Sequence, residues 1–372
     1  MHIQHHPFPP PSSGTSRALQ SFHFGAPGRG RKVYIQASLH ADELPGMLVA
    51  HHLRARLLEL EAAGKILGEV VLVPVSNPVG LAQMLQGTPF GRFDLATGVN
   101  FNRDYRDPTA ALIAALAGKL GADGARNVGL IRAEIARILE AWQPLSETEA
   151  LKKTLQVLAM DADIVLDLHC DNEAVLHLYA GAPLAERAAP LAALMGAEVF
   201  LLSRVMGGDP FDEVCGRLWW ELAEHFGAAY PIPCACLSVT VELRGETQVT
   251  HAQAQGDAQA LLAFLAHSGV LDLPAPALPA PRCAPTPLAG VEAIVAPSAG
   301  LLVFLKEPGD YVEQGEALAD LIDPFSGASV ALRAGVSGVL FGRVARRYVH
   351  AGMSLAKIAG KLPFRTGKLL SL

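Results

Sequence analysis

A histidine and a glutamate stand three residues apart in the stretch VYIQASLHADE, which spans residues 33–43. The apolar residues at its start predict a buried strand, and apolar residues at three- and four-residue intervals after Glu43 predict a helix. His40 and Glu43 therefore follow the carboxyl end of a strand, where open α/β sheets bind their ligands. An imidazole and a carboxylate placed there can point at one cation, so we predict that they are two of three protein ligands to a catalytic zinc ion.

This spacing has a second interpretation. With 13 histidines and 36 acidic residues in 372, a histidine followed three positions later by an acid arises by chance roughly once. Asp42 and Glu43 would also suit the positive N-terminal end of a helix dipole, with His40 as a simple loop residue. The metal hypothesis therefore depends on residues further along the chain.

Two such residues belong to other predicted strands. His169 ends the apolar strand IVLDLH, and a close pair of ligands with a distant third is the pattern of catalytic zinc sites. The alternative is a core histidine; Asp167, two residues earlier, either supports His169 or caps a helix. Glu242 stands in the strand SVTVEL, where a carboxylate is costly unless it is paired or used. It is either a general base beside the metal or the salt-bridge partner of Arg244.

The stretch GVNFNRDY, residues 98–105, offers hydrogen-bond donors. Asn102 and Arg103 form a fork of donors that suits a carboxylate, such as that of a small substrate. The alternative is a surface loop held by Asp104 or Asp107.

The elements that must position these residues alternate between strands and helices from residue 29 to residue 270. Besides the strand at residue 33, apolar strands are predicted at residues 70–80, 162–170, 197–203 and 234–243. Helices are predicted at residues 110–120, 130–142, 217–226 and 252–267. Apolar strands separated by helices predict an α/β fold, with a mostly parallel or mixed sheet sandwiched by helices.

The composition changes after residue 270. Residues 271–288 are rich in proline and alanine and predict a semi-rigid linker. Residues 289–372 contain an internal repeat, in which three pairs of residues correspond: Gly300 with Gly338, Leu302 with Leu340, and Leu318 with Leu355. Two related halves without helices predict an all-β barrel sandwich with two-fold pseudosymmetry. This domain resembles the biotinyl/lipoyl carrier domains, but the hairpin at residues 323–329 lacks their modified lysine, so no carrier function is expected.

The composition argues against several classes of protein. The net charge of −6 and the pI of about 6.1 argue against a nucleic-acid partner. No apolar run reaches the ~18 residues of a membrane span, so no membrane partner is expected. Residues 1–28 lack the apolar segment of a secretory signal and predict a flexible arm. The five cysteines, odd in number and without CxxC pairs, predict reduced thiols in the cytoplasm.

Taken together, the motifs resemble the zinc carboxypeptidase superfamily: an HxxE pair, an Asn-Arg pair, a distant histidine and a glutamate in a TxEL strand. Within it, the chain from about residue 33 onward most resembles the succinylglutamate desuccinylase/aspartoacylase family. The resemblance implies three sets of residues: one Zn²⁺ per chain on His40, Glu43 and His169, a substrate carboxylate on Asn102 and Arg103, and Glu242 as the catalytic base. The family also uses arginines on an acidic acyl group or on the scissile carbonyl. Arg92 is the candidate for catalysis and Arg244 for substrate contact, but no arginine shortly precedes Glu242.

The activity that this resemblance implies is hydrolysis of the amide bond in a small N-acyl amino acid. Zinc would activate a water molecule and Glu242 would move its proton. Two alternatives stay open: a zinc carboxypeptidase that trims peptides, and a non-catalytic module that binds zinc or a small molecule. The acyl group and the amino acid are left open, as is a homo-oligomeric state.

Overall fold

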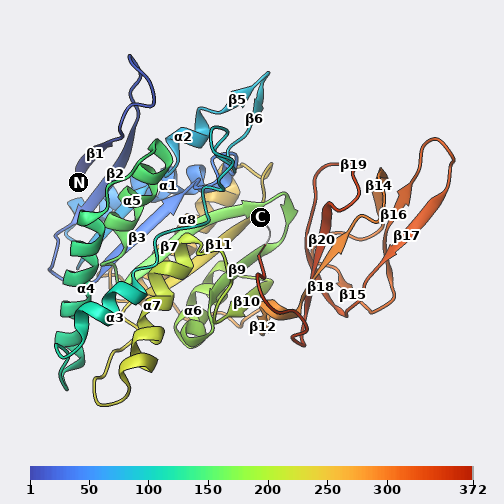
Figure 1. The fold of residues 1–372 in the computed structure, drawn as a ribbon. Helices are drawn as coiled ribbons and strands as arrows, with labels where there is room; N and C mark the ends of the chain where they lie inside the picture. Colours follow the sequence, from blue (N-terminus) through green and yellow to red (C-terminus); the bar gives the residue numbers. More distant parts are fainter. Residues whose placement is uncertain (371–372) are drawn as a thin grey trace.

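Nine strands form one mixed sheet across the larger part of the protein, as seen in a computed structural model that describes residues 1–370 (Figure 1). In spatial order the strands are β1 (His2–Pro7), β2 (Ala18–Gly25), β4 (Glu69–Val73), β3 (Lys32–Ala37), β7 (Ile164–Asp171), β11 (Leu237–Gly245), β9 (Leu176–Gly181), β10 (Val199–Ser203) and β12 (Pro285–Pro287). The central strands β4, β3, β7 and β11 are parallel, so their carboxyl ends share one edge.

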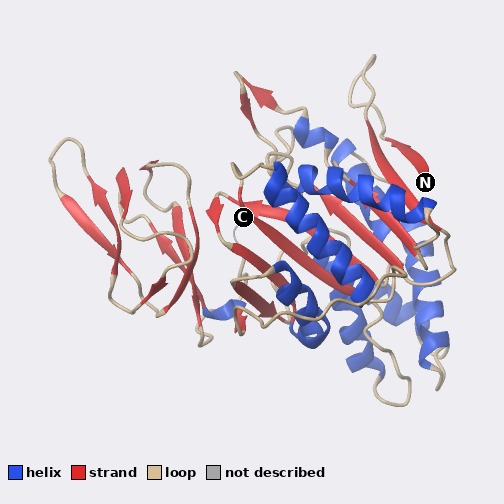
Figure 2. Ribbon diagram, turned by 180° about the vertical axis from the view of Figure 1, so that it is seen from behind, coloured by secondary structure: helices blue, strands red, loops and turns tan. Residues whose placement is uncertain are grey.

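Helices cover both faces of this sheet, as the views from the two sides show (Figures 1 and 2). One face carries α1 (Pro45–Ala62), α6 (Ala185–Met195) and α8 (His251–His267). The other carries α3 (Thr109–Leu116), α4 (Gly124–Ala141), α5 (Glu147–Ala159) and α7 (Phe211–Phe226). The shorter elements are α2 (Pro78–Leu81), β5 (Met84–Leu85), β6 (Thr88–Pro89), β8 (Glu173–Ala174), and the 3₁₀ turns at Ala182–Leu184 and Leu288–Gly290.

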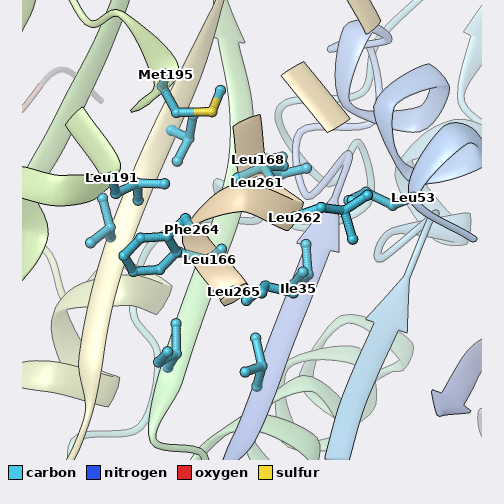
Figure 3. Packing of buried hydrophobic residues seen from close by; sticks show 14 of the residues in the cluster. Ile35, Leu53, Leu166, Leu168, Leu191, Met195, Leu261, Leu262, Phe264 and Leu265 are labelled. Atoms are coloured by element: carbon cyan, nitrogen blue, oxygen red, sulfur yellow. The ribbon is translucent and has the colours of Figure 1, made fainter. Parts of the chain in front are cut away.

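The central strands are apolar because both of their faces are buried. Figure 3 shows Ile35 and Leu166 of the sheet packed beside Leu53 of α1, Leu191 of α6 and Leu265 of α8. All five side chains are fully buried. This core confirms the predicted α/β fold with a mixed sheet between helices, and it fixes the strand ends that carry His169 and Glu242.

The first 28 residues differ from the prediction of a flexible arm, which was wrong. Strands β1 and β2 form an antiparallel hairpin, and β2 continues the sheet by pairing with β4. Phe22 and Phe24 of β2 are buried in the core. The sequence hides this strand because its apolar alternation covers only a few residues and is interrupted by His23.

The end of the predicted linker at residues 271–288 also differs from the prediction, because it contains a strand of the large sheet. Its last residues form β12, which pairs with β10 at the edge of the large sheet. The segment therefore runs along the large domain before the smaller domain begins.

A smaller β domain (residues 291–360) projects from this edge of the large domain (Figure 1). One of its sheets holds β13 (Val291–Val295), β20 (Ser354–Gly360), β18 (Gly338–Arg343) and β15 (Tyr311–Val312), and the other holds β17 (Ser329–Arg333), β16 (Ala317–Ile322), β14 (Gly300–Phe304) and β19 (Tyr348–Val349). The predicted repeat is present, because β14, β15 and β16 of the first half correspond to β18, β19 and β20 of the second. The halves exchange strands, since β14 pairs with β19 and β15 pairs with β18.

The β domain is bonded to the large domain near the ends of β7 and β9. Strand β8 pairs with β18, and the amide of Val175 donates to the carbonyl of Phe341 at 3.0 Å. Arg343 and Arg347 both form ion pairs with Glu173. These contacts place one wall of the β domain at the edge of the large sheet that carries the predicted site.

Across residues 1–370, no helix combines the length and the apolar character needed to cross a membrane.

Candidate active site

The structure brings His40, Glu43 and His169 together, although the last is more than 120 residues from the first two. The Nδ1 atom of His40 lies 2.7 Å from Oε1 of Glu43, and Nδ1 of His169 lies 2.8 Å from Oε2. His40 and Glu43 stand in the loop between β3 and α1, and His169 stands near the end of β7, which pairs with β3. All three residues are buried.

In each imidazole Nε2 has a partner, which leaves Nδ1, the nitrogen that faces Glu43, for a cation. Nε2 of His40 lies 3.0 Å from Oδ1 of Asn100, an oxygen that also accepts the amide N–H of Asn102 at 2.8 Å. Nε2 of His169 lies 3.0 Å from Oδ2 of Asp167. Since both partners are acceptors, both Nε2 atoms carry the proton, and each Nδ1 can offer a lone pair. Two imidazole nitrogens and one carboxylate match the ligand set of catalytic zinc sites.

The electrostatics of this cluster also favour a cation. Burial alone would lower the pKa of His169, but Asp167 and Glu43 beside it raise that pKa well above its usual value. Burial likewise opposes ionisation of Glu43, yet His40 and His169 hold its pKa well below the usual range. The carboxylates of Asp167 and Glu43 therefore favour positive charge at this position, and a cation would replace the proton on Nδ1 of His169. His40, Glu43 and His169 could hold a metal ion.

Asp167, which forms an ion pair with His169, is held in place by a chain of hydrogen bonds. Oδ1 of Asp167 accepts from the side chain of Gln36 at 2.8 Å, and Oε1 of Gln36 accepts from the hydroxyl of Tyr34 at 2.8 Å. All three of these side chains are fully buried. Of the two interpretations of Asp167, the geometry agrees with support of His169.

Glu242 lies beside His169 on the neighbouring strand. The two residues are register partners in β11 and β7, and adjacent strands lie about 4.8 Å apart. Glu242 lines the same cavity, and its Oε2 is buried without a hydrogen-bond partner among the described residues. Burial and the charge of Glu43 raise the pKa of Glu242 to about 8.

The alternative role of Glu242, a salt bridge with Arg244, is not present. The register of β11 shifts between Glu242 and Gly245, and Arg244 has a positive φ of 70°. Arg244 instead pairs with Asp257 of α8 at 2.5 Å. It is not among the residues that line the cavity, so the structure separates it from the other predicted substrate contacts.

Two arginines and an asparagine meet at the same cavity, as predicted. Arg92 places Nη1 at 3.3 Å from both Nδ1 of His40 and Oε1 of Glu43. Burial and the charge of Arg92 lower the pKa of Arg103. Asn102 accepts the amide N–H of Phe211 at 2.9 Å and directs its side-chain nitrogen toward His169 at 3.4 Å. This region is suited to an anionic group.

The cavity has a volume of about 280 Å³, and residues of both domains line it. Tyr179 and Asp212 of the large domain line it, together with Lys357 of the β domain and Arg365 of the segment that follows β20. The sequence interpretation missed all four. Burial, followed by the charges of Asp167 and Glu213, raises the pKa of Asp212 to about 7. No motif marks Lys357 or Arg365, because only the docking of the β domain brings them to the site.

The fold and the cluster together define a mixed α/β protein with a site that could hold a metal ion. Residues 29–120 match the family model of the succinylglutamate desuccinylase/aspartoacylase catalytic domain. The resemblance to this family that the motifs predicted is therefore confirmed. This resemblance supports a hydrolase.

Solved structures agree with this assignment. A succinylglutamate desuccinylase/aspartoacylase family protein from Shewanella amazonensis is 28% identical with a TM-score of 0.84, and the match covers 97% of this chain and 99% of that one. A second protein of this description, from Shewanella frigidimarina, is 25% identical with a TM-score of 0.84, over 96% and 97% of the two chains. The product-bound ectoine utilization protein EutE (DoeB) from Ruegeria pomeroyi shares the fold, at 16% identity and a TM-score of 0.67 over 96% and 94%. No curated protein matches the chain.

Proposed function

We propose that the protein is a zinc-dependent deacylase, which hydrolyses the amide bond of a small N-acyl amino acid. The observation that carries the proposal is the carboxylate of Glu242. It faces the cavity beside His169, and its Oε2 has no hydrogen-bond partner in the described part of the chain. A buried carboxylate without a partner is costly, which favours a role in moving a proton.

The residues that line the cavity have separate roles in the proposed reaction. Asn102 and Arg103 hold the carboxylate of the substrate and thereby place the amide near His40, Glu43 and His169. Those three residues would hold a zinc ion, which would supply Lewis-acid chemistry and make a water molecule easier to deprotonate.

Glu242 then takes the proton of the attacking water and returns it to the leaving nitrogen. Arg92 lies within 3.3 Å of the ligand cluster and stabilises the negative charge that develops on the carbonyl oxygen. Burial and the charge of Glu43 raise the pKa of Glu242 to about 8, and a cation beside it would lower that pKa and favour the basic form.

Two rival functions fit the cavity less well. A peptide-trimming carboxypeptidase needs an open groove, whereas residues of the β domain wall a cavity of about 280 Å³ here. A non-catalytic binding module has no need of a base, and Oε2 of Glu242, which lines the cavity, has no hydrogen-bond partner within residues 1–370. Both considerations favour the deacylase.

The test is a metal analysis of the purified protein, followed by a screen of N-acyl amino acids beside short peptides. We expect about one zinc per chain, loss of turnover on chelation and recovery with Zn²⁺, and hydrolysis of N-acyl amino acids only. Peptide hydrolysis without deacylation would support the carboxypeptidase instead. Metal binding without hydrolysis of either class would support the binding module.

A further inference from the structure

Three histidines gather on the large domain outside the candidate active site. His51 and His52 are consecutive residues of α1, and His251 is the first residue of α8. The ring of His52 contacts both of the others, with its centre 5.1 Å from that of His51 and 5.3 Å from that of His251. None of the three lines the cavity of the candidate active site. The packing of α1 beside α8 therefore forms a second group of imidazoles, which the proposed reaction does not use.

Two of these rings place nitrogen atoms at the separation that two ligands of one metal ion take. Nε2 of His52 lies 3.1 Å from Nδ1 of His251. A zinc ion binds imidazole nitrogen at about 2.0–2.1 Å, so two such ligands are about 3.3 Å apart at a tetrahedral angle and about 2.9 Å apart at a right angle. The observed separation lies between these two values. Binding of one cation by both nitrogens therefore requires rotation of the rings rather than a shift of either helix.

The protonation of this group also favours binding of a metal ion. Burial, followed by the charges of His51 and His251, lowers the pKa of His52, so its imidazole is neutral at neutral pH. Only a neutral imidazole has a nitrogen lone pair to offer to a metal. Without a metal, one of the two facing nitrogens carries a proton and donates to the other. Since both rings reach solvent, that proton can move to the other nitrogen of its own ring, which frees both lone pairs.

The surroundings leave room for the remaining ligands of a cation. His52 lines a hollow of about 500 Å³ between α1, α8 and the segment that follows α8. Gln255 stands one turn after His251 in α8 and lines the same hollow. The amide oxygen of Gln255 can serve as a third ligand, and water molecules can complete the coordination.

A cation at this place would join two helices that adjoin the candidate active site along the chain. Helix α1 begins two residues after Glu43, and α8 follows β11, which carries Glu242. Leu53 of α1 and Leu262 of α8 belong to the same core cluster (Figure 3). A metal ion bound by both helices at the surface would add to this packing, so it would stabilise the folded chain.

We propose that His52 and His251 form a second metal site, which binds a divalent transition-metal ion such as Zn²⁺, Ni²⁺ or Cu²⁺. Nitrogen ligands select these ions over Mg²⁺ and Ca²⁺, which prefer oxygen ligands. With two imidazoles as its main protein ligands, the site is weaker than that of His40, Glu43 and His169. It therefore fills only when the free ion reaches micromolar concentrations, and purification in metal-free buffer leaves it empty.

Equilibrium dialysis of the demetallated full-length protein against micromolar Zn²⁺ tests the proposal. The wild type is expected to bind about one more ion per chain than His52→Ala or His251→Ala. His267→Ala is the matched control and should bind as the wild type does, because His267 is an exposed histidine of α8 outside the hollow. The candidate active site and the other histidines are common to all four proteins, so the difference measures this site alone.

Two further measurements distinguish nitrogen ligands from a general attraction of cations. Cu²⁺ is expected to bind more tightly than Zn²⁺, and millimolar Mg²⁺ is expected to displace neither ion. Zn²⁺ is expected to raise the Tm of the wild type more than that of His251→Ala, since only the folded chain holds the two rings together. Equal Zn²⁺ binding by the wild type and both histidine variants, displacement by Mg²⁺, or an equal rise in Tm would overturn the inference. The two rings would then share only a hydrogen bond.

Discussion

The unpaired carboxylate of Glu242 is the residue on which the proposed chemistry depends most directly. Glu242→Gln keeps the shape of the side chain but cannot accept a proton, so we expect kcat to fall by about 10²- to 10⁴-fold. Zinc content should not change, because the ligand atoms belong to His40, Glu43 and His169. Glu224→Gln, at an exposed position of α7, is the control and should behave like the wild type. Turnover of Glu242→Gln near the wild-type level would remove this residue from the mechanism.

A second prediction concerns Asp167, which touches the metal cluster only through His169. Asp167→Asn replaces a charged acceptor beside Nε2 of His169 with a neutral amide. We expect zinc affinity to fall by about 10- to 100-fold, as is typical of changes to groups that orient metal-binding histidines. Competition with a chelator measures this affinity, and Asp161→Asn, an exposed residue just before β7, is the control. Equal affinity in both variants would show that Asp167 does not support the site.

At the scale of secondary-structure elements, the N-terminal hairpin of β1 and β2 is part of the large domain. Phe24 of β2 is fully buried against the core, so its truncation leaves a cavity. We expect Phe24→Ala to lower the free energy of unfolding by about 3–5 kcal/mol. Urea denaturation measures this change, with Gln20→Ala at an exposed position of the same strand as the control. If the two variants are equally stable, the hairpin is not part of the core.

The elements that could be predicted from the sequence are those with long apolar patterns. Strands β3, β4 and β7 are buried on both faces and contain apolar runs, and His40 and His169 follow from the ends of β3 and β7. Strand β11 alternates apolar with polar residues, which also indicates a strand. Strand β9 was not predicted, since LHLYAG mixes small, polar and aromatic residues within six positions. Its position between β11 and β10 depends on pairing across more than 50 residues of chain, which local patterns do not encode.

At the scale of the whole molecule, the two domains complete one site between them. Glu43, His169 and Glu242 could be inferred from motifs. Glu43 stands between a recognisable strand and the start of a helix, and His169 and Glu242 stand in the last part of recognisable strands. Lys357 and Arg365 could not, because their position depends on how the β domain docks on β8 and β9. The contacts at this interface therefore complete the lining of the cavity, which the large sheet alone does not provide.

His177 is buried at the interface between the two domains. Its ring lies 5.0 Å from that of Phe341 in the β domain, and its Nδ1 donates to the carbonyl of Val175 at 2.8 Å. Burial lowers the pKa of His177 to about 4, although the charge of Asp171 opposes the shift and that of Lys357 adds to it. The folded protein therefore keeps this imidazole neutral at pH values at which an unfolded chain, with a histidine pKa of about 6.5, binds a proton.

The sign of the resulting pH dependence follows from this difference. The contribution of His177 to stability is complete above pH 6.5, declines as the pH falls from 6.5 to about 4, and is lost below that value. Its full size is on the order of 3 kcal/mol. The glutamine of the His177→Gln variant does not bind a proton. Between pH 6.5 and 4, the free energy of unfolding of this variant should therefore fall by about 3 kcal/mol less than that of the wild type. Urea denaturation in the presence of a chelator removes the separate effect of metal release, and His5→Gln at an exposed position is the control. If wild type and His177→Gln lose stability in parallel, His177 becomes protonated without leaving the interface, and water must reach the contact between the domains.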